Sequence, residues 1–271
     1  MAGAPPIEGP LWLVGCGNMG GAMLRGWIAA GLDPAQVTVI DPAEPALPAG
    51  VTWLPSPPPD GARPATLLLA VKPQLLDRVA PAIAPVLGEE TLLLSILAGV
   101  EVASLRARFA APHAIVRVMP NTPAAIGKGV LALYGDVDAA TERRVTRLMA
   151  ALGLAEWIAR EDQFDAVTAV SGCGPAFLFR FVDALARAGA ELGLPADQAA
   201  RLALATVEGA AGLAVAADES PAVLADRVAS PGGSTRAGLN VLDEGDALAT
   251  LLRRTLEAAA RRNAEMAAAA R

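Results

Sequence analysis

A glycine-rich turn near the start of the chain has the residue types and spacing that bind a dinucleotide. Gly15, Gly17 and Gly20 follow an apolar run, and an acid, Asp41, stands about 20 residues further on. The first glycine permits the tight bend, the second lets the backbone approach a pyrophosphate, and the third lets helix and strand pack closely. Free N–H groups at the start of the next helix then face the phosphates. The alternative is a turn that serves packing alone.

The acid after the second apolar run bears on which dinucleotide is bound. Asp41 could accept hydrogen bonds from the adenosine ribose, which favours NAD(H) over NADP(H). Glu44 would add repulsion toward a 2′-phosphate. The nearest basic residue downstream is Arg63. The alternative is that Asp41 is only a turn residue before Pro42.

Other candidate contacts end later apolar runs, at the sheet edge where such folds bind ligands. Lys72 precedes Pro73 and is one of only two lysines in the chain, so it is either a ligand contact or a solvated side chain. Ala98 and Asn121 follow later runs, where small residues and an amide could wall a nicotinamide pocket.

A second glycine-rich segment lies near the C-terminus. Residues 230–235 read Ser-Pro-Gly-Gly-Ser-Thr and precede a helical stretch over residues 236–242. Their backbone N–H groups and hydroxyls suit a carboxylate, although an ordinary helix-capping loop has the same composition. Residues 171–175 are similarly ambiguous: they could be a cap, a close-packing site or part of a pocket floor.

The sequence lacks the residues that catalytic triads, metal sites and cysteine nucleophiles require. His113 is the only histidine and follows Pro112 directly, so we expect a structural role and neither a Ser-His-Asp triad nor a His-based metal site. Cys16 and Cys173 lie in Gly-rich turns without a histidine partner, which argues against nucleophilic roles. We therefore expect no metal. Hydride transfer needs none of these groups, because the cofactor carries the reaction.

The elements that must position these groups follow an alternating pattern in the first part of the chain. Strands are predicted at residues 11–15, 37–41, 66–71, 91–96, 115–119, 129–134 and 154–158. Helices are predicted at residues 19–30, 74–87, 102–109 and 139–152. Such alternation implies βαβ units and a parallel sheet. Residues 54–61 are rich in proline and form a predicted loop.

Beyond residue 160 the pattern is helical only. Ala-rich helices are predicted at residues 177–192, 196–216 and 246–270, with a wide apolar surface that is either buried or shared between subunits. The sequence therefore predicts an α/β protein with a Rossmann-type dinucleotide-binding domain over residues 1–160. An all-helical domain follows over residues 161–271.

Composition narrows the class of protein. The chain has 271 residues, 54% of them hydrophobic, and a net charge of −6, which argues against binding nucleic acid. It has no uninterrupted apolar run of 18 residues, so we expect no membrane span. Its start lacks the basic segment of a signal peptide, and its two cysteines have no metal or disulfide spacing. We expect a cytoplasmic protein.

Together these motifs resemble the pyrroline-5-carboxylate reductase family over about residues 11–262. The matching segments are Val-Gly-Cys-Gly-Asn-Met-Gly at 14–20, Ala-Val-Lys-Pro at 70–73, Ala-Gly-Val at 98–100, Met-Pro-Asn-Thr-Pro at 119–123, Asp-Ala-Val-Thr-Ala-Val-Ser-Gly-Cys-Gly-Pro-Ala at 165–176, Gly-Leu-Pro at 193–195 and Ser-Pro-Gly-Gly-Ser-Thr at 230–235. The two long C-terminal motifs are highly specific in combination, whereas a Rossmann turn alone is not.

The resemblance implies reduction of 1-pyrroline-5-carboxylate to L-proline, the last step of proline synthesis, with NADP(H) or NAD(H). The substrate-binding residues would be Ser230, Gly232, Gly233, Ser234 and Thr235. The carboxylate would lie on the backbone of Gly232 to Ser234, and Thr235 would be the catalytic residue, bonded to the ring nitrogen. The cofactor-binding residues would be Val14, Gly15, Cys16, Gly17, Asn18, Met19, Asp41, Ala70, Val71, Lys72, Pro73, Ala98 and Asn121.

The resemblance also implies that the C-terminal helical domain forms a homodimer, and dimers in this family often assemble into decamers. The chain departs from the family at Cys173 and Phe177, where many relatives have Ser and Tyr. Asp41 stands where NADPH-using relatives often have Ser or Thr.

Three other hypotheses compete with this one, and the sequence argues against the first. A β-hydroxyacid dehydrogenase would need a lysine on the helix at residues 177–192, which has none. A reductase of another cyclic imine differs by a methylene, worth only about 1–3 kcal/mol of discrimination. A regulator could bind the cofactor without turnover.

Overall fold

The computed structural model describes residues 7–58 and 61–269. The chain forms two compact units: the first comprises residues 1–173 with residues 259–271, and the second comprises residues 174–258. The first unit thus extends beyond the predicted domain boundary at residue 160. It does so because Phe164 packs on the sheet, with its ring edge against Tyr134 at a centroid distance of 6.5 Å. Parts of three predicted elements lie outside the described residues. They are residues 1–6 of the first domain, residues 59–60 of the proline-rich loop, and residues 270–271 at the end of the last helix and the second domain.

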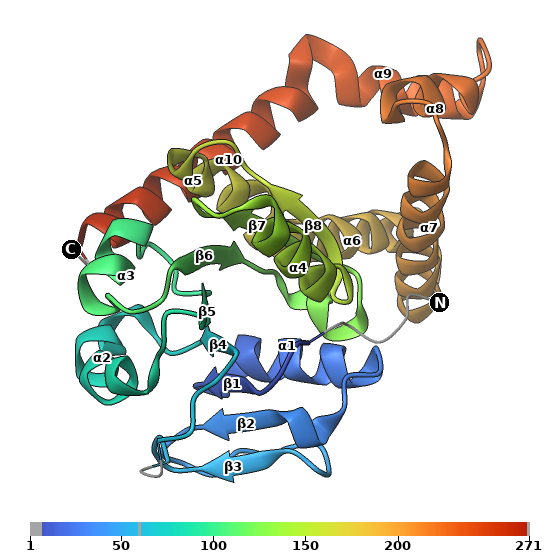
Figure 1. The fold of residues 1–271 in the computed structure, drawn as a ribbon. Coiled ribbons are helices and arrows are strands. Elements are labelled where there is room, and N and C mark those ends of the chain that lie inside the picture. Colours follow the sequence, from blue (N-terminus) through green and yellow to red (C-terminus); the bar gives the residue numbers. More distant parts are fainter. Residues whose placement is uncertain (1–6, 59–60, 270–271) are drawn as a thin grey trace. The chain divides into compact units, whose positions relative to one another are not determined.

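An eight-stranded sheet forms the centre of the first unit, in the order β3-β2-β1-β4-β5-β6-β7-β8 (Figure 1). The strands are β1 (Leu11–Val14), β2 (Val37–Ile40), β3 (Thr52–Leu54), β4 (Thr66–Leu69), β5 (Leu92–Ser95), β6 (Ala114–Met119), β7 (Gly129–Tyr134) and β8 (Gly153–Trp157). All neighbours pair in parallel except β6 and β7. The strand order reverses beside β1, the switch point at which Rossmann sheets bind ligands. The predicted Rossmann-type fold is confirmed.

Helices cover both faces of this sheet, because its central strands are apolar on both sides. Leu11 and Leu13 of β1 belong to one buried cluster, whereas Trp12 and Val14 belong to another. The first cluster includes side chains of α1 (Asn18–Ala29) and α4 (Ala139–Ala150). The second includes side chains of α2 (Leu76–Ile83) and α3 (Val102–Arg108).

The remaining helices follow the sheet along the chain. They are α5 (Phe164–Val167), the π-helical turn η6 (Thr168–Gly172), α6 (Gly174–Glu191), α7 (Ala196–Ala216), α8 (Pro221–Arg227), α9 (Ser234–Asp243) and α10 (Ala247–Ala269). Short 3-10 turns are η1 (Pro34–Gln36), η2 (Pro73–Leu75), η3 (Ala84–Val86), η4 (Thr122–Ile126), η5 (Glu161–Gln163) and η7 (Glu244–Asp246). Within the described part of the chain no strand follows β8, as predicted.

The second unit exposes much apolar surface in the single chain. The exposed apolar side chains on α6 and α7 include Phe179, Phe181, Leu202, Leu204, Leu213 and Val215. By length and composition alone, the helical segment Glu161–Glu191 and the helix Ala196–Ala216 are also apolar enough to cross a membrane. Charged residues such as Arg201 and Glu208 interrupt the apolar sequence of α7.

Candidate active site

The three glycines of the first turn are required for different reasons. Gly15 has a φ of 89°, and a Cβ there would lie 2.9 Å from the carbonyl oxygen of Ala70. A Cβ on Gly20 would lie 2.6 Å from the Gly15 carbonyl oxygen, whereas a Cβ on Gly17 would meet no atom within 4 Å. The first and third glycines therefore make the turn and its packing possible. The second opens onto free space that a ligand can approach.

The start of α1 is arranged to receive an anion. Gly17 is the N-cap of this helix and provides no side-chain cap, so the first N–H groups of α1 lack partners within the helix. The turn is held by two neighbouring strands: Gly15 N–H donates to the Ile40 carbonyl at 2.9 Å, and Ala70 N–H donates to the Val14 carbonyl at 2.8 Å. Unpaired N–H groups and the positive end of the helix dipole suit a phosphate.

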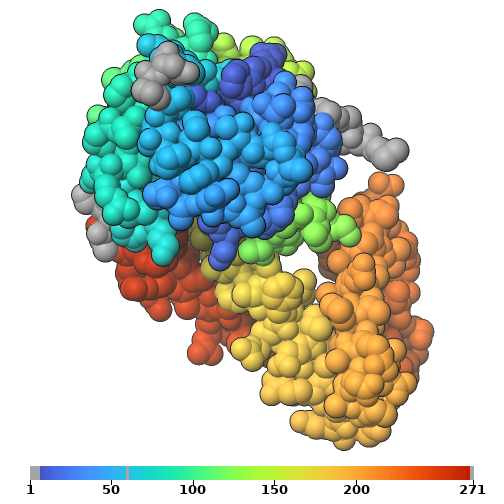
Figure 2. Space-filling view, turned by 90° about the horizontal axis from the view of Figure 1, so that it is seen from below, coloured from blue at the N-terminus to red at the C-terminus, as the bar shows by residue number. Residues whose placement is uncertain are grey.

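A cavity of about 680 Å³ lies beside this turn. Its walls come from the ends of β1, β2 and β4, the loop after β3, and α2. In Figure 2 the light-blue atoms around β3 adjoin the cyan atoms of α2. The predicted cofactor residues that line the cavity are Val14, Gly15, Gly17, Asp41, Ala70, Val71 and Lys72. Those that belong to the same turns but lie outside its lining are Cys16, Asn18, Met19 and Pro73.

Asp41 joins the loop after β2 to the glycine turn. Its Oδ2 accepts the Cys16 N–H at 2.9 Å, and its Oδ1 accepts the Ala43 N–H at 3.1 Å. Each carboxylate oxygen has a second acceptor direction, so the side chain retains capacity for a ribose hydroxyl. Glu44 is exposed and does not line the cavity. Arg63 lies near Gly88, before β5, at the other edge of the sheet.

The Cys16 thiol in this turn is unsuited to nucleophilic attack. Burial raises its pKa, and the negative charge of Asp41 raises it further, while Arg25 opposes both effects. A raised pKa keeps the sulfur protonated near neutral pH, and the thiol is a much weaker nucleophile than the thiolate.

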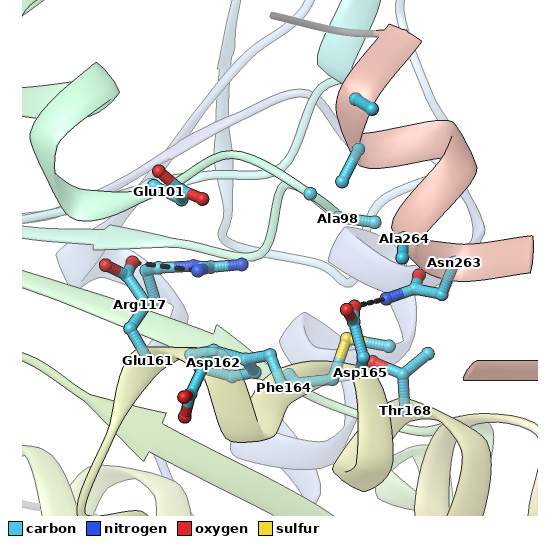
Figure 3. A pocket seen from close by; sticks show the side chains of 14 residues that line it. Ala98, Glu101, Arg117, Glu161, Asp162, Phe164, Asp165, Thr168, Asn263 and Ala264 are labelled. Carbon is cyan, nitrogen blue, oxygen red and sulfur yellow. Dashed lines mark hydrogen bonds and ion pairs between the residues drawn. The ribbon is translucent and has the colours of Figure 1, made fainter. Parts of the chain in front are cut away.

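A second cavity, of about 490 Å³, lies at the same sheet edge (Figure 3). Arg117 at its wall donates to Glu161 at 2.8 Å and stacks over the Phe164 ring at 4.1 Å from the centroid. Asn263 of α10 donates to Asp165 across the cavity. Ala98, a predicted cofactor contact, lines this cavity. Of the charged groups around it, Arg117 and Glu161 are paired with each other, and Asp165 accepts a hydrogen bond from a neutral amide.

Asn121 does not line either cavity. Its side chain is buried: Nδ2 donates to the Ser171 carbonyl at 2.9 Å, and Oδ1 accepts the Val130 N–H at 2.8 Å. The amide therefore ties β7 to the π-helical turn. That turn ends at Gly172 and α6 begins at Gly174, so within residues 171–175 Cys173 lies between two helical elements, with a helical backbone conformation of its own.

The predicted substrate residues form one loop in the second unit. Gly232 has a φ of 73°, and Gly233 is the N-cap of α9, with its N–H donating to the Ser230 carbonyl at 3.0 Å. Ser234 and Thr235 form the first turn of α9 and are exposed. Their N–H groups lack helical partners and a side-chain cap. This entry has the donors that a carboxylate requires.

An ion pair fixes the loop that carries these donors. Arg236, in the first turn of α9, contacts Asp226 of α8 at 2.6 Å. The pair joins the two helices on either side of residues 228–233, and so restricts the loop between them.

Some lining residues were not predicted from the sequence. In the larger cavity they include Leu75, Arg78 and Val79. A signal existed for the α2 residues, because a helix that starts directly after Lys72 must begin at the ligand-binding edge. In the smaller cavity they include Glu161, Asp162 and Asp165. No sequence motif or residue spacing identified those three acids as lining a pocket.

The chain offers no metal site in the part that the structure describes: no group of three or more His, Cys, Asp or Glu side chains there could hold an ion.

Two family models match separate parts of the chain. A model described as pyrroline-5-carboxylate reductase dimerisation matches residues 161–266. A model described as NADP oxidoreductase, coenzyme F420-dependent, matches residues 11–99.

Individual relatives match over almost the whole chain. Pyrroline-5-carboxylate reductase of Pseudomonas aeruginosa is 39% identical over 94% of this chain and 95% of its own length. The Pisum sativum enzyme is 35% identical with the same coverage of both chains. Among solved structures, the Coxiella burnetii reductase has a TM-score of 0.87 at 32% identity, covering 96% of this chain and 98% of that one. The Plasmodium falciparum reductase, solved with NADP bound, has a TM-score of 0.82 at 28% identity with the same coverage. The chain therefore belongs to the pyrroline-5-carboxylate reductase family.

Proposed function

We propose that this chain reduces 1-pyrroline-5-carboxylate to L-proline with NAD(P)H, the last step of proline biosynthesis. The observation that carries the proposal is the presence, in one chain, of a dinucleotide cavity and a Gly-Gly-Ser-Thr helix entry. Relatives that match 94% of the chain are named for this reaction. Neither feature alone identifies a substrate.

The first unit fits a nicotinamide dinucleotide. Gly17 leaves open space at the start of α1, where unpaired N–H groups can hold the pyrophosphate. Asp41 retains acceptor capacity for the adenosine ribose and favours NADH. When bound, the cofactor supplies a hydride to the imine carbon. The proposed cofactor contacts are Val14, Gly15, Cys16, Gly17, Asn18, Met19, Asp41, Ala70, Val71, Lys72, Pro73, Ala98 and Asn121.

The helix entry of the second unit binds the imine. Backbone N–H groups of Gly232 to Ser234 hold the substrate carboxylate. The hydroxyl and carbonyl oxygens of Ser230 lie close to Gly233 and so help to shape the loop. The Thr235 hydroxyl donates a hydrogen bond to the ring nitrogen of the neutral imine. Because a threonine hydroxyl is a poor acid, it orients the ring and relays a proton from water. Protonation of the nitrogen makes the imine carbon more electrophilic.

The active form is a homodimer built on the C-terminal helices, and such dimers assemble further into a decamer. The exposed apolar side chains of α6 and α7 support this assembly, because a folded monomer rarely leaves so much apolar surface in water. The partner's helices complete each active site. The protein works in the cytoplasm on a small imine, without nucleic acid or membrane.

The decisive experiment follows cofactor oxidation with 1-pyrroline-5-carboxylate, in parallel with NADH and NADPH. We expect turnover, and 1-pyrroline without the carboxylate should be a much poorer substrate because it leaves the α9 donors unpaired. Cofactor binding without turnover would contradict the proposal and favour another cyclic imine, such as a six-membered ring, or a non-catalytic regulator.

A further inference from the structure

One positively charged side chain that lines the cofactor cavity does not belong to the glycine motif. Arg78 lies on α2 and lines the cavity together with Leu75 and Val79. Its side chain is exposed. Within the described residues it has no hydrogen-bond or ion-pair partner. Its charge is therefore available to a ligand.

The neighbouring acid on the same helix does not neutralise Arg78. Asp77 contacts the Arg108 Nε of α3 at 2.6 Å, and that bond lowers the pKa of the Asp77 carboxyl. Asp77 and Arg108 line a different, smaller pocket with Ser104. The acid is thus committed to a partner on another helix.

The charged side chains that the structure describes in this cavity have a positive formal sum. Among the residues that the structure describes, three charged side chains line it: Asp41, Lys72 and Arg78. Their formal sum is positive although the whole chain carries −6. The carboxylate of Asp41 is also partly compensated, because both of its oxygens accept backbone N–H groups.

The loop after β3 adds a neutral donor to the same cavity. Ser56 lines it between Pro55 and Pro57, and a serine hydroxyl can donate to a phosphate oxygen. Prolines on both sides restrict this loop. A cation and a hydroxyl from two separate elements therefore line the space that Asp41 also borders.

We propose that Arg78 binds the 2′-phosphate of NADPH, with Ser56 as a second donor, and so allows this chain to use NADPH despite Asp41. A monoester phosphate carries a charge of about −1.5 to −2 at neutral pH, and the planar guanidinium matches its oxygens in a bidentate way. Asp41 then sets the affinity for NADH, and Arg78 sets the affinity for NADPH. The inference rests on the proposed cofactor site but not on the identity of the imine.

The test is nucleotide binding to the purified full-length chain without substrate, followed by reduced-nicotinamide fluorescence. Adenosine 2′,5′-bisphosphate and AMP serve as competitors that differ only in the 2′-phosphate. The variants are Arg78→Gln and Arg78→Lys. The control is Arg147→Gln on α4, an exposed arginine that lines neither large cavity.

We expect Arg78→Gln to weaken NADPH and the bisphosphate by roughly ten- to one-hundred-fold, as for a lost charge-assisted bond. NADH and AMP should change by less than about two-fold, Arg78→Lys should recover part of the loss, and the control should change nothing. Equal losses for NADH and NADPH would overturn the proposal, because Arg78 would then contact a shared part of the cofactor. An unchanged NADPH affinity would also overturn it.

The result separates this inference from the proposed function. A wild-type chain that binds NADH but not NADPH overturns the role of Arg78 alone. A chain that binds neither nucleotide overturns both. Because turnover is not measured, a failure to reduce 1-pyrroline-5-carboxylate leaves the Arg78 result valid on its own.

Discussion

Thr235 is the residue with the most specific expected role in the reaction. Replacing it by Ala removes the hydroxyl that we propose to orient the ring nitrogen but leaves the backbone donors of α9. We expect kcat to fall by roughly ten- to one-hundred-fold, as for one hydrogen bond made to a charged group, with cofactor affinity unchanged. Thr235→Ser keeps the hydroxyl and should restore most of the rate. Steady-state kinetics measure both, and unchanged turnover in the Ala variant would remove Thr235 from the mechanism.

Asp41 is the residue expected to discriminate against the 2′-phosphate. Asp41→Ser removes a negative charge from the cavity wall, so the ratio of NADPH to NADH affinity should rise by at least about five-fold. Glu44→Ser is the matched control, because Glu44 stands close in sequence but does not line the cavity. Fluorescence titration of each variant gives the ratios. An equal response of the two variants would argue against a local role for Asp41.

Cys16 reports the electrostatics of the glycine turn. Because burial and Asp41 raise its thiol pKa, the reactive thiolate forms only at higher pH than for an ordinary cysteine. We expect slow alkylation by iodoacetamide at pH 7 and a rate that rises steeply above it, measured in a Cys173→Ser background. Asp41→Asn should lower the Cys16 pKa and shift the rate profile to lower pH. A profile that does not move would show that the Asp41 charge is not felt at the sulfur.

Sequence reasoning identified the motif residues but not their neighbours from other elements. Gly15, Gly17 and Asp41 could be recognised because their spacing within one βαβ unit is diagnostic. Arg78 could not, because only the docking of α2 on the sheet brings it to the cavity. Asn121 was placed at the right edge, but its amide is engaged by Ser171, a residue distant in sequence. Contacts between distant segments leave no local pattern.

The first helix and its turn offer a matched pair of glycine substitutions. Gly20→Ala forces a methyl group to 2.6 Å from the Gly15 carbonyl oxygen, so we expect a loss of about 1–3 kcal/mol in unfolding free energy. Gly17→Ala meets no protein atom and should leave stability nearly unchanged, but its methyl group occupies the approach to the pyrophosphate and should weaken cofactor binding. Thermal unfolding and nucleotide titration separate the two effects. Equal destabilisation by both substitutions would contradict this assignment.

The elements that the sequence missed are short. β3 has three residues, Thr52–Leu54, and becomes a strand because β2 offers it a parallel edge. α8 has seven residues, begins with Pro221 and has Ser220 as its N-cap, with the hydroxyl accepting the Val223 N–H. Long, strongly periodic segments such as α1, α4 and α7 could be predicted to within a few residues. Short segments depend on neighbours more than on their own composition.

The whole molecule should associate through its second unit. Leu204 of α7 is 60% exposed in the single chain, and Leu154 of β8 is 59% exposed. Because the two leucines are almost equally exposed but lie in different units, Leu154 serves as the control for a substitution at Leu204. Leu204→Asp would bury an unpaired charge in the expected interface, and its measured mass should fall toward that of a monomer. Leu154→Asp should leave the mass unchanged. Light scattering after size exclusion measures this, and a monomeric wild-type chain would contradict the proposed dimer.

The first unit is also discontinuous along the chain, and this affects the order of events during synthesis. Asn263 lies on the last helix and bonds to Asp165 across 98 residues, while the same helix packs Ala267 against Gly99. A ribosome adding roughly 5–20 residues per second takes about 5–20 seconds to cover that separation. The sheet is therefore fully translated well before its final helical segment. Throughout that interval, the nascent polypeptide leaves Asp165 and the loop at Gly99 open to chaperones and to other unfinished chains.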